Sequence, residues 1–284
     1  MTYQTIATDR QIEASTDQTI TLTKLSPNCG VEVGGVDLTK PLSASQVETL
    51  RNAVGEHCVI FFRDQKISIE DHTRFASYFG KLHHHVGPSS SSKVAAEHPA
   101  VRKQHFDKNS KKVSGEVWHT DQSCAPIPPM GSILYNHIVP PDSGGDTLFA
   151  NMYAAYEGLT PRMKAYLDGL TATHDGRVSF GPTAPVSDHP IIVRHPVTGR
   201  RLLFVNECFT TRINGLPDYE SEGLLNVLFE HCRSDEWSMR FHWREHSIAF
   251  WDNRCAQHKA IWDYWPHTRS GYRVQIQGDA PPVA

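Results

Sequence analysis

The chain has 284 residues, of which 39% are hydrophobic and 21% charged, and its formal net charge is −3. This composition is typical of a folded globular protein, the balanced charge argues against a nucleic-acid partner, and no apolar run reaches the roughly 20 residues of a membrane helix. Residues 1–18 are polar and lack the apolar core of an export signal, so we expect a cytoplasmic protein with a flexible N-terminal tail and a single domain over residues 19–284.

The first part of this domain mixes strand and helix signals. Alternating or continuous apolar residues predict strands over residues 19–25, 31–38 and 58–63. Ser45 with Glu48, and Ser68 with Asp71, fit the capping box that opens a helix, and Gly80 would end the second helix. We therefore expect two helices beside an early group of strands.

Two irregular segments interrupt the middle of the chain. Residues 83–117 contain consecutive histidines and serines with little periodicity, which predicts a long loop that flanks a functional site. Residues 175–190 are also irregular and are a candidate lid. Between these segments, Thr160 and Pro161 mark a helix start, with proline in its first turn. Strand signals lie at residues 131–139 and 146–151.

The last third of the chain is rich in short strands around one helix near residues 218–232. These strand signals lie at residues 191–195, 201–206, 237–243, 247–252 and 272–278. Many short strands with a few peripheral helices predict a mainly β fold, an antiparallel barrel or jelly roll. The six cysteines form no C-x-x-C pair, and we expect reduced thiols.

A metal site is the first candidate for chemistry. In an extended strand, His119 and Asp121 would face the same way and offer an imidazole and a carboxylate to one ion. His258 follows a strand signal, and two histidines with one carboxylate form the facial triad of non-haem Fe(II) oxygenases. Zinc accepts the same ligand types, so a zinc-dependent hydrolase stays open, as does a non-catalytic binding protein on the same barrel.

A pair of arginines is the second candidate. If a strand begins near Arg269, then Arg269 and Arg273 point to one face, about 13 Å apart at 3.3 Å per residue. Guanidinium groups inside a barrel are costly unless they meet anions, and their planar shape suits carboxylate or sulfonate oxygens. One barrel interior would then hold a metal ion and two anion-binding groups.

Taken together, these motifs resemble the Fe(II)/2-oxoglutarate-dependent dioxygenases of the taurine dioxygenase (TauD/TfdA) family. The resemblance runs from about residue 20 to residue 280 and rests on VEVGGVDL, FFRDQ, FGKLHHH, WHTD, GGDTLFANM, HPVTGRRLLFVNECFTTRI and WDNRCAQH. It implies a double-stranded β-helix core, which is a jelly roll of the cupin-like kind, an enzyme that consumes O2, and a homodimer or homotetramer.

The resemblance also implies the cofactor-binding residues. Fe(II) would be held by His119, Asp121 and His258, which are thereby the catalytic centre. The distal carboxylate of 2-oxoglutarate would bind Arg269, assisted by the hydroxyl of Thr147. Because relatives that halogenate lack the carboxylate ligand, the presence of Asp121 favours hydroxylation.

The substrate-binding residues follow from the same resemblance. Arg273 and His85 match the groups that bind the anionic head of the substrate in the taurine enzymes, and Phe180 and Phe209 match aromatic walls of that pocket. These matches predict a small anionic organic substrate, in particular an organosulfonate that would break down to sulfite and an aldehyde after hydroxylation.

The chain departs from the taurine enzymes at several positions of that pocket. Gly115 stands where they have asparagine, Pro88 where they have tyrosine, and Ile261 and Trp262 where they have small residues. The anion-binding end is therefore kept while the contacts to the rest of the substrate differ. An alkyl sulfate ester, a sulfonated sugar or an aryloxyalkanoic acid remain alternative substrates.

Overall fold

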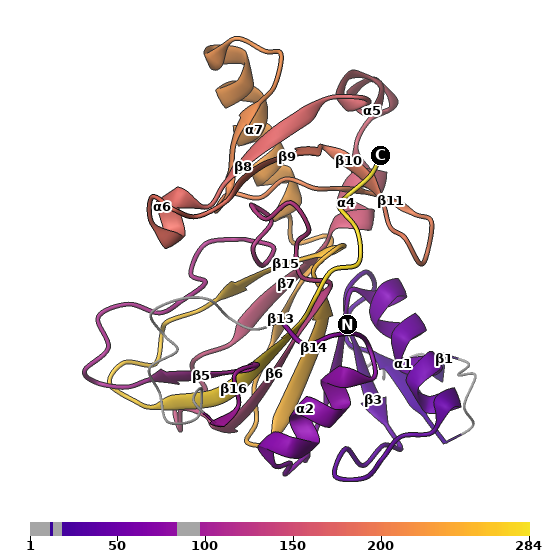
Figure 1. Ribbon diagram of the computed structural model, residues 1–284, viewed down its shortest axis with the longest axis vertical. Coiled ribbons are helices and arrows are strands. Elements are labelled where there is room, and N and C mark those ends of the chain that lie inside the picture. The colour runs from indigo at the N-terminus through magenta and orange to yellow at the C-terminus, as the bar shows by residue number, and fades with distance from the viewer. Residues whose placement is uncertain (1–11, 14–18, 84–96) are drawn as a thin grey trace, which may run out of the picture.

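The computed structural model describes residues 12–13, 19–83 and 97–284 of the chain. Within these residues, a large sheet occupies the lower part of the molecule, and a group of shorter strands and helices lies above it (Figure 1). The helices are α1 (Ala44–His57), α2 (Ile69–Ser77), α4 (Met152–Gly158), α5 (Pro161–Leu167), α6 (Arg177–Phe180) and α7 (Asp218–Cys232).

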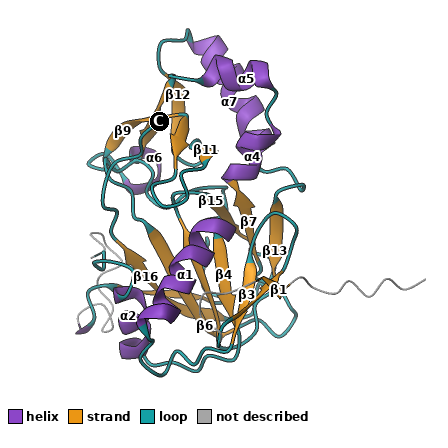
Figure 2. Ribbon diagram, turned by 90° about the vertical axis from the view of Figure 1, so that its right-hand side faces the viewer, coloured by secondary structure: helices purple, strands orange, loops and turns teal. Residues whose placement is uncertain are grey.

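An eight-stranded sheet is the main structural layer. Its strands, in order across the sheet, are β1 (Ile12–Glu13), β2 (Thr21–Lys24), β3 (Val31–Gly34), β4 (Val59–Phe62), β14 (Ser247–Asp252), β6 (Gly131–Ile138), β16 (Arg269–Ile276) and β5 (Val101–Phe106). One face of this sheet is covered by α1 and α2 (Figure 2). Phe75 of α2 packs edge-on against Phe62 and Phe250 of the sheet, so this face forms one hydrophobic core.

A second, three-stranded sheet packs on the opposite face. Its order is β13 (Ser238–Phe241), β7 (Thr147–Asn151) and β15 (Ala256–Ala260). Phe61 of β4 stacks on Phe241 of β13 with ring centroids 3.8 Å apart, and it meets Phe149 of β7 edge-on at 5.5 Å. These aromatic contacts hold the two sheets together on one side. On the other side, a cavity lies between the sheets.

The upper part of the molecule contains the remaining strands. A three-stranded sheet has the order β12 (Thr210–Ile213), β8 (Thr171–Asp175) and β9 (Val186–Pro190), and β10 (Ile192–Arg194) pairs with β11 (Arg201–Leu203). Helix α7 packs against β12, and α4 packs against β11 (Figure 1). The prediction of a β-rich fold with peripheral helices is therefore confirmed.

Capping residues explain where the predicted helices begin. Ser68 and Asp71 form the predicted capping box of α2, and Thr160 caps α5. The predicted box of α1 is wrong by two residues, because Ser43 has the extended backbone (φ −70°, ψ 161°) that a cap requires. Its hydroxyl accepts a hydrogen bond from the backbone N–H of Gln46, whose side chain completes the box.

The two segments predicted to be irregular both contain a strand. Residues 83–117 include β5, which pairs antiparallel with β16, and residues 175–190 include α6 and β9. Strand β5 escaped prediction because its alternating residues are polar on both faces, so no apolar periodicity marks it. His84 and His85 lie outside the described residues, as does Pro88.

Other expectations can be compared directly with the structure. All six cysteines are free thiols, as predicted. None of the helices in the described part has the length and apolarity needed to cross a membrane. Apart from β1, the predicted tail lies outside the described residues, and the division into a tail and a single domain stays a prediction.

Candidate active site

Two histidines from distant parts of the chain meet through their backbones. His258 lies within β15, and its N–H donates to the carbonyl of His119 at 2.8 Å, while the N–H of His119 donates back at 3.1 Å. His119 makes this single bridge and does not belong to a strand, so the predicted extended strand at this position is wrong. This bridge brings the two imidazole rings together, with centroids 4.1 Å apart, and Nδ1 of His119 is hydrogen-bonded to the carbonyl of Val117 at 2.8 Å.

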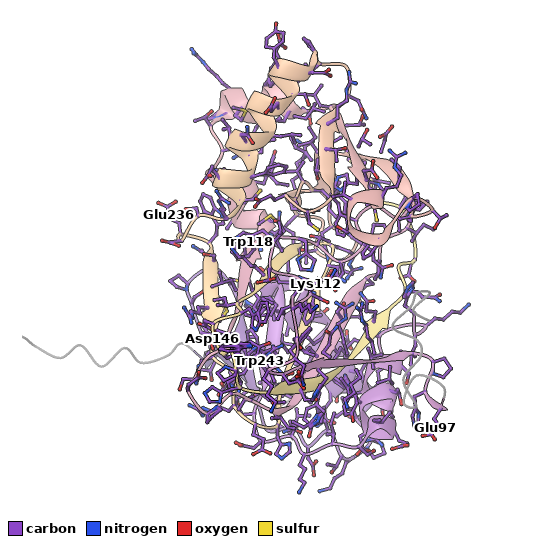
Figure 3. All side chains as sticks on the ribbon, turned by 90° about the vertical axis from the view of Figure 1, so that its left-hand side faces the viewer. Glu97, Lys112, Trp118, Asp146, Glu236 and Trp243 are labelled. Atoms are coloured by element: carbon purple, nitrogen blue, oxygen red, sulfur yellow. The ribbon has the colours of Figure 1, made fainter. Side chains whose placement is uncertain are left out.

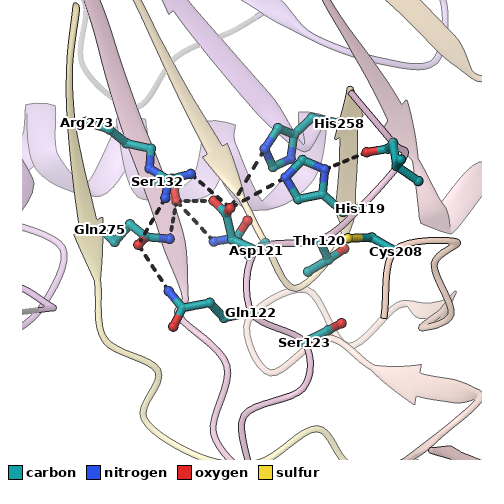
Figure 4. Close-up of polar contacts among 12 residues, drawn as sticks. His119, Thr120, Asp121, Gln122, Ser123, Ser132, Cys208, His258, Arg273 and Gln275 are labelled. Atoms are coloured by element: carbon teal, nitrogen blue, oxygen red, sulfur yellow. Dashed lines mark hydrogen bonds and ion pairs between the residues drawn. The ribbon is translucent and has the colours of Figure 1, made fainter. Parts of the chain in front are cut away.

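The carboxylate of Asp121 faces both imidazoles (Figure 4). Its Oδ1 lies 3.7 Å from Nε2 of His119 and 4.0 Å from Nε2 of His258. All three side chains are buried, and their ligand atoms lie within 4.8 Å of one another. The structure thus brings together the three residues that were predicted from the sequence as metal ligands. The prediction paired His119 with Asp121 through an extended strand, which is not present.

The protonation of these residues suits a metal ion. Burial lowers the pKa of His119 and of His258, so both rings are neutral at pH 7, which is the form that coordinates metals. Burial alone would raise the pKa of Asp121, but the Arg273 guanidinium and the two imidazoles outweigh it and hold that pKa well below its usual range. Two neutral imidazoles and one carboxylate are a donor set that fits Fe(II).

Hydrogen bonds fix the orientation of the carboxylate. Ser132 of β6 donates to Oδ2 of Asp121 at 2.7 Å, which leaves Oδ1 toward the imidazoles. Asn253 and Gln275 in turn donate to the Ser132 hydroxyl, at 3.3 and 3.2 Å. Such partners orient metal ligands. No sequence pattern indicated Ser132, because the register of β6 in the sheet is what brings its hydroxyl to Asp121, and that register leaves no local signal in the sequence.

The triad opens into a cavity between the two sheets. Its lining comes from β5, β6, β14 and β16 of the large sheet and from β7 and β15 of the smaller one. Aromatic and aliphatic side chains form its apolar part, namely Phe106, Leu134, Phe149, Trp243 and Trp251. The polar lining includes both imidazoles of the triad, Thr147, Arg269 and Arg273. Both arginines of β16 therefore face one cavity, as their spacing predicted.

Arg269 is buried in this cavity without a bound acid. It is 5% exposed, and no carboxylate of the described residues forms a salt bridge with it. Its guanidinium lies over the ring of Trp243, 5.3 Å from the centroid. Trp243, which is labelled in Figure 3, donates through Nε1 to Oγ1 of Thr147 at 3.0 Å. Burial lowers the pKa of Arg269, because a charge withdrawn from water is costly. A bound anion would offset that cost.

Arg273 has different surroundings, beside the Asp121 carboxylate. Its Nη1 donates to Oδ1 of Asp121 at 3.0 Å, and its Nη2 approaches Oε1 of Gln275 at 3.5 Å. Oδ1 is also the oxygen that faces the two imidazoles, so this guanidinium neutralises the carboxylate from the side of the cavity (Figure 4).

The structure places the predicted aromatic wall outside the immediate lining of this cavity. The rings of Phe180 and Phe209 pack together with centroids 5.5 Å apart. Phe209 is buried, whereas Phe180 on α6 is 53% exposed. The pair belongs to the upper part of the molecule, and its role toward a substrate stays a prediction.

Gly115 explains one of the departures from the taurine enzymes. It lines the cavity with φ +86°, and a Cβ at this position would lie 2.9 Å from Cε1 of His119. Its carbonyl also accepts the N–H of Ala260 at 2.7 Å. In this backbone conformation a larger residue would displace the metal-facing ring.

A second group of potential ligands consists of His195, Asp252 and Cys255. Here Nε2 of His195 bonds to Asp252 at 3.1 Å, and Arg254 donates to both carboxylate oxygens. These bonds satisfy the carboxylate within the turn that leads into β15. The group therefore has a structural explanation that requires no metal.

Known proteins resemble this chain in both sequence and fold. The family model for "Taurine catabolism dioxygenase TauD, TfdA family" matches residues 21–275. A crystal structure of a taurine dioxygenase from Burkholderia xenovorans is 37% identical, with a TM-score of 0.83, covering 93% of this chain and 91% of that one.

Curated relatives differ in the substrates that their names give. An alkylsulfatase from Acinetobacter baylyi is 30% identical over 92% of this chain and 86% of its own. An alpha-ketoglutarate-dependent sulfonate dioxygenase from Saccharomyces cerevisiae is 31% identical over 91% and 67%. An alpha-ketoglutarate-dependent 2,4-dichlorophenoxyacetate dioxygenase from Cupriavidus pinatubonensis is 30% identical over 83% and 90%. The chain belongs to the TauD/TfdA family and is an α-ketoglutarate (2-oxoglutarate)-dependent dioxygenase.

Proposed function

We propose that this dioxygenase hydroxylates a small organosulfonate at the carbon that bears the sulfonate, and that the product breaks down to sulfite and an aldehyde. One observation carries the proposal: the imidazoles of the His119, Asp121 and His258 triad line a single cavity together with two guanidinium groups. A cavity with two cationic groups suits a reaction between two anionic molecules, 2-oxoglutarate and an anionic substrate.

We infer that the two facing sheets form a double-stranded β-helix, with the triad on its inner walls. His119, Asp121 and His258 would hold Fe(II), which, when bound, supplies the chemistry that couples oxidative decarboxylation of 2-oxoglutarate to substrate hydroxylation by O2. The Ser132 hydrogen bond would keep one oxygen of Asp121 directed at the iron.

Arg269 would bind the distal carboxylate of 2-oxoglutarate, assisted by Thr147. The support for this role is that Arg269 is buried without a salt bridge to a described carboxylate, beside the Thr147 hydroxyl that Trp243 fixes. A bidentate bond to the planar guanidinium would orient the whole cosubstrate before the substrate enters.

Arg273 would bind the sulfonate, with His85 as a second contact and Phe180 and Phe209 as aromatic walls. Hydroxylation converts the C–H bond beside sulfur into C–OH. The hydroxyl then loses its proton as the C=O bond forms, and the C–S bond breaks with its electron pair remaining on sulfur. The products from the substrate are an aldehyde and sulfite, while 2-oxoglutarate yields succinate and CO2.

The relatives support alternative substrates for the same site. An alkyl sulfate ester would release sulfate, an aryloxyalkanoic acid would release a phenol, and a sulfonated sugar would release sulfite with a sugar aldehyde. Released sulfate or phenol identifies the ester or the aryloxy acid, whereas a sulfonated sugar is identified by its aldehyde product. The family resemblance also leads us to expect a homodimer or homotetramer, which light scattering would test.

The deciding experiment is reconstitution of the enzyme with Fe(II) and 2-oxoglutarate without oxygen, followed by O2 and one candidate substrate at a time. We expect succinate and sulfite in equal amounts with a sulfonate. Sulfate or phenol release in place of sulfite would overturn the sulfonate proposal in favour of the matching alternative. Because the chain belongs to a family of 2-oxoglutarate-dependent dioxygenases, we expect no turnover without O2 and 2-oxoglutarate, neither of which a zinc-dependent hydrolase would need.

A further inference from the structure

An uncharged amide lines the cavity between the two arginines of β16. Gln104 of β5 belongs to the cavity lining, and in the antiparallel register of the two strands it is directly opposite Gly271. Gly271 is midway between Arg269 and Arg273, two residues or about 7 Å from each. Gln104 is therefore a diagonal cross-strand neighbour of both arginines, at a separation that long side chains can span.

Strand β16 cannot supply a side chain at this place itself. A Cβ atom on Gly271 would collide with the backbone carbonyl oxygen of Tyr135 on β6, so a larger residue would force these two strands apart. The polar group that lines the cavity between the two arginines therefore comes from the neighbouring strand β5.

The amide of Gln104 is available to a ligand. Among the residues that the structure describes, none forms a hydrogen bond with this side chain. Gln104 is half-buried in the row of β5 that faces the cavity, as is Phe106 two residues later, whereas Lys103 and His105 on the other face are exposed. A side-chain amide donates hydrogen bonds without adding charge, so it suits an anion that cations already hold.

The other donors of the cavity indicate which part of 2-oxoglutarate this amide would meet. At one end, Arg269 forms no salt bridge with a described carboxylate and lies beside the Thr147 hydroxyl, so the distal carboxylate has two donors. At the metal end, Nη1 of Arg273 already donates to Asp121. The carboxylate beside the keto group needs a donor of its own, which Gln104 can provide.

We propose that Gln104 is a cosubstrate-binding residue, and that its amide N–H donates a hydrogen bond to the carboxylate beside the keto group of 2-oxoglutarate. With the distal carboxylate at Arg269 and the keto acid at the metal end, the molecule passes Gln104 on the way. This inference rests on the proposed role of Arg269 and is independent of the identity of the organic substrate. It also gives β5 a role, as the strand that flanks the cosubstrate.

The test measures the binding of two keto acids to the Mn(II)-loaded protein by isothermal titration calorimetry, without an organic substrate. One is 2-oxoglutarate, and the other is 2-oxopentanoate, which has the same number of carbons but no distal carboxylate. Gln104→Met removes the amide at nearly constant length and should raise the Kd of both acids by about tenfold, the value of one hydrogen bond to a charged group. Arg269→Ala should raise the Kd of 2-oxoglutarate alone, by about tenfold or more.

Further variants control for indirect effects. Lys103→Met makes the same replacement on the exposed face of β5 and should change neither Kd by more than about twofold. Gln104→Glu keeps the shape of the side chain but replaces its donor with a carboxylate, so it should weaken both acids at least as much as Gln104→Met. The Kd of Mn(II) and the Tm of Gln104→Met should match those of wild type, because Gln104 is not a proposed metal ligand.

The outcomes separate this inference from the function on which it rests. If Arg269→Ala behaves as expected but Gln104→Met binds both acids like wild type, the inference alone is overturned. A loss in Gln104→Met that is confined to 2-oxoglutarate also overturns it, because the contact would then be to the distal carboxylate. If Arg269→Ala binds 2-oxoglutarate normally, the proposed role of Arg269 fails, and the titration with 2-oxopentanoate still decides whether Gln104 contacts the keto acid.

Discussion

The two arginines of β16 lie four residues apart in one cavity, yet their surroundings are opposite. Arg269 is buried beside Trp243 and forms no salt bridge with a described carboxylate, whereas Arg273 bonds to Asp121 at 3.0 Å. In the first region, the positive charge of Arg269 has no salt-bridge partner among the described residues, so a bound anion would stabilise it. In the second, the charge of Arg273 is paired with the Asp121 carboxylate, and Arg102 is its neighbour on the adjacent strand.

With the proposed roles of the two arginines, this difference would allow one strand to bind two ligands. A cosubstrate that never changes is best bound by a rigid, isolated cation with a neighbouring hydroxyl, which is the arrangement of Arg269 and Thr147. In the proposed function, the substrate, which differs among the relatives, would bind at Arg273, where the positive charge is already paired with a carboxylate.

The largest effect is expected from Asp121→Ala. Removing this carboxylate deletes a proposed metal ligand and leaves Arg273 beside two imidazoles. Iron-dependent succinate formation should therefore fall by more than about a hundredfold, which exceeds the usual effect of losing a residue that only hydrogen-bonds to a metal ligand. Asp235→Ala, at an exposed position, is the matched control. Near-normal turnover by Asp121→Ala would show that the ligand set is wrong.

The contrast between the arginines is tested by replacing each of them separately with alanine. Arg269→Ala should raise KM for 2-oxoglutarate by about 10–100-fold, the value of a hydrogen-bonded charge pair, with little effect on the KM of the organic substrate. Arg273→Ala should show the converse. Steady-state kinetics with each compound varied in turn provide the measurement, and each variant is the control for the other. The reverse pattern would mean that the two roles are interchanged.

The same two arginines should also differ in how much a metal ion stabilises the protein when each arginine is replaced. Without a metal, Arg273 is the cation nearest to Asp121, so Arg273→Ala leaves a buried carboxylate uncompensated until a metal binds. The gain in Tm on adding Mn(II) to chelator-treated protein should exceed that of wild type by about 2–4 °C per kcal/mol of lost compensation. Arg269→Ala should gain no more than wild type. Equal gains in all three proteins would contradict this account.

A smaller effect is expected from Ser132→Ala. The hydroxyl orients Asp121 through Oδ2 and is not itself a ligand, so Fe(II) affinity should weaken by about tenfold while the fold is retained. Anaerobic titration with Fe(II) measures the change. Ser77→Ala, at an exposed position at the end of α2, is the control. An unchanged affinity would show that Asp121 is oriented by Arg273 alone.

Local patterns in the sequence predicted several features correctly. The apolar run that became β4, the Ser68 capping box and the Thr160–Pro161 helix start all depend on neighbouring residues, and all are confirmed. The spacing of Arg269 and Arg273 predicted a shared face because strand geometry repeats every two residues. Features whose cause lies within a few residues can be read from the chain.

Features that depend on pairing between distant segments could not be read in this way. His119 is aligned by a single bridge to β15, Ser132 reaches Asp121 through sheet register, and β5 is a strand because β16 offers it partners. None of these contacts leaves a local periodicity.

By itself, the sequence determined the kind of chemistry, since the ligand types, the arginine spacing and the family motifs are all written in the residues. Only the tertiary structure decided which side chains share the cavity. The physical reason is that backbone hydrogen bonds set the register between strands, and a shift of one residue would turn Gln104 away from the cavity to the exposed face.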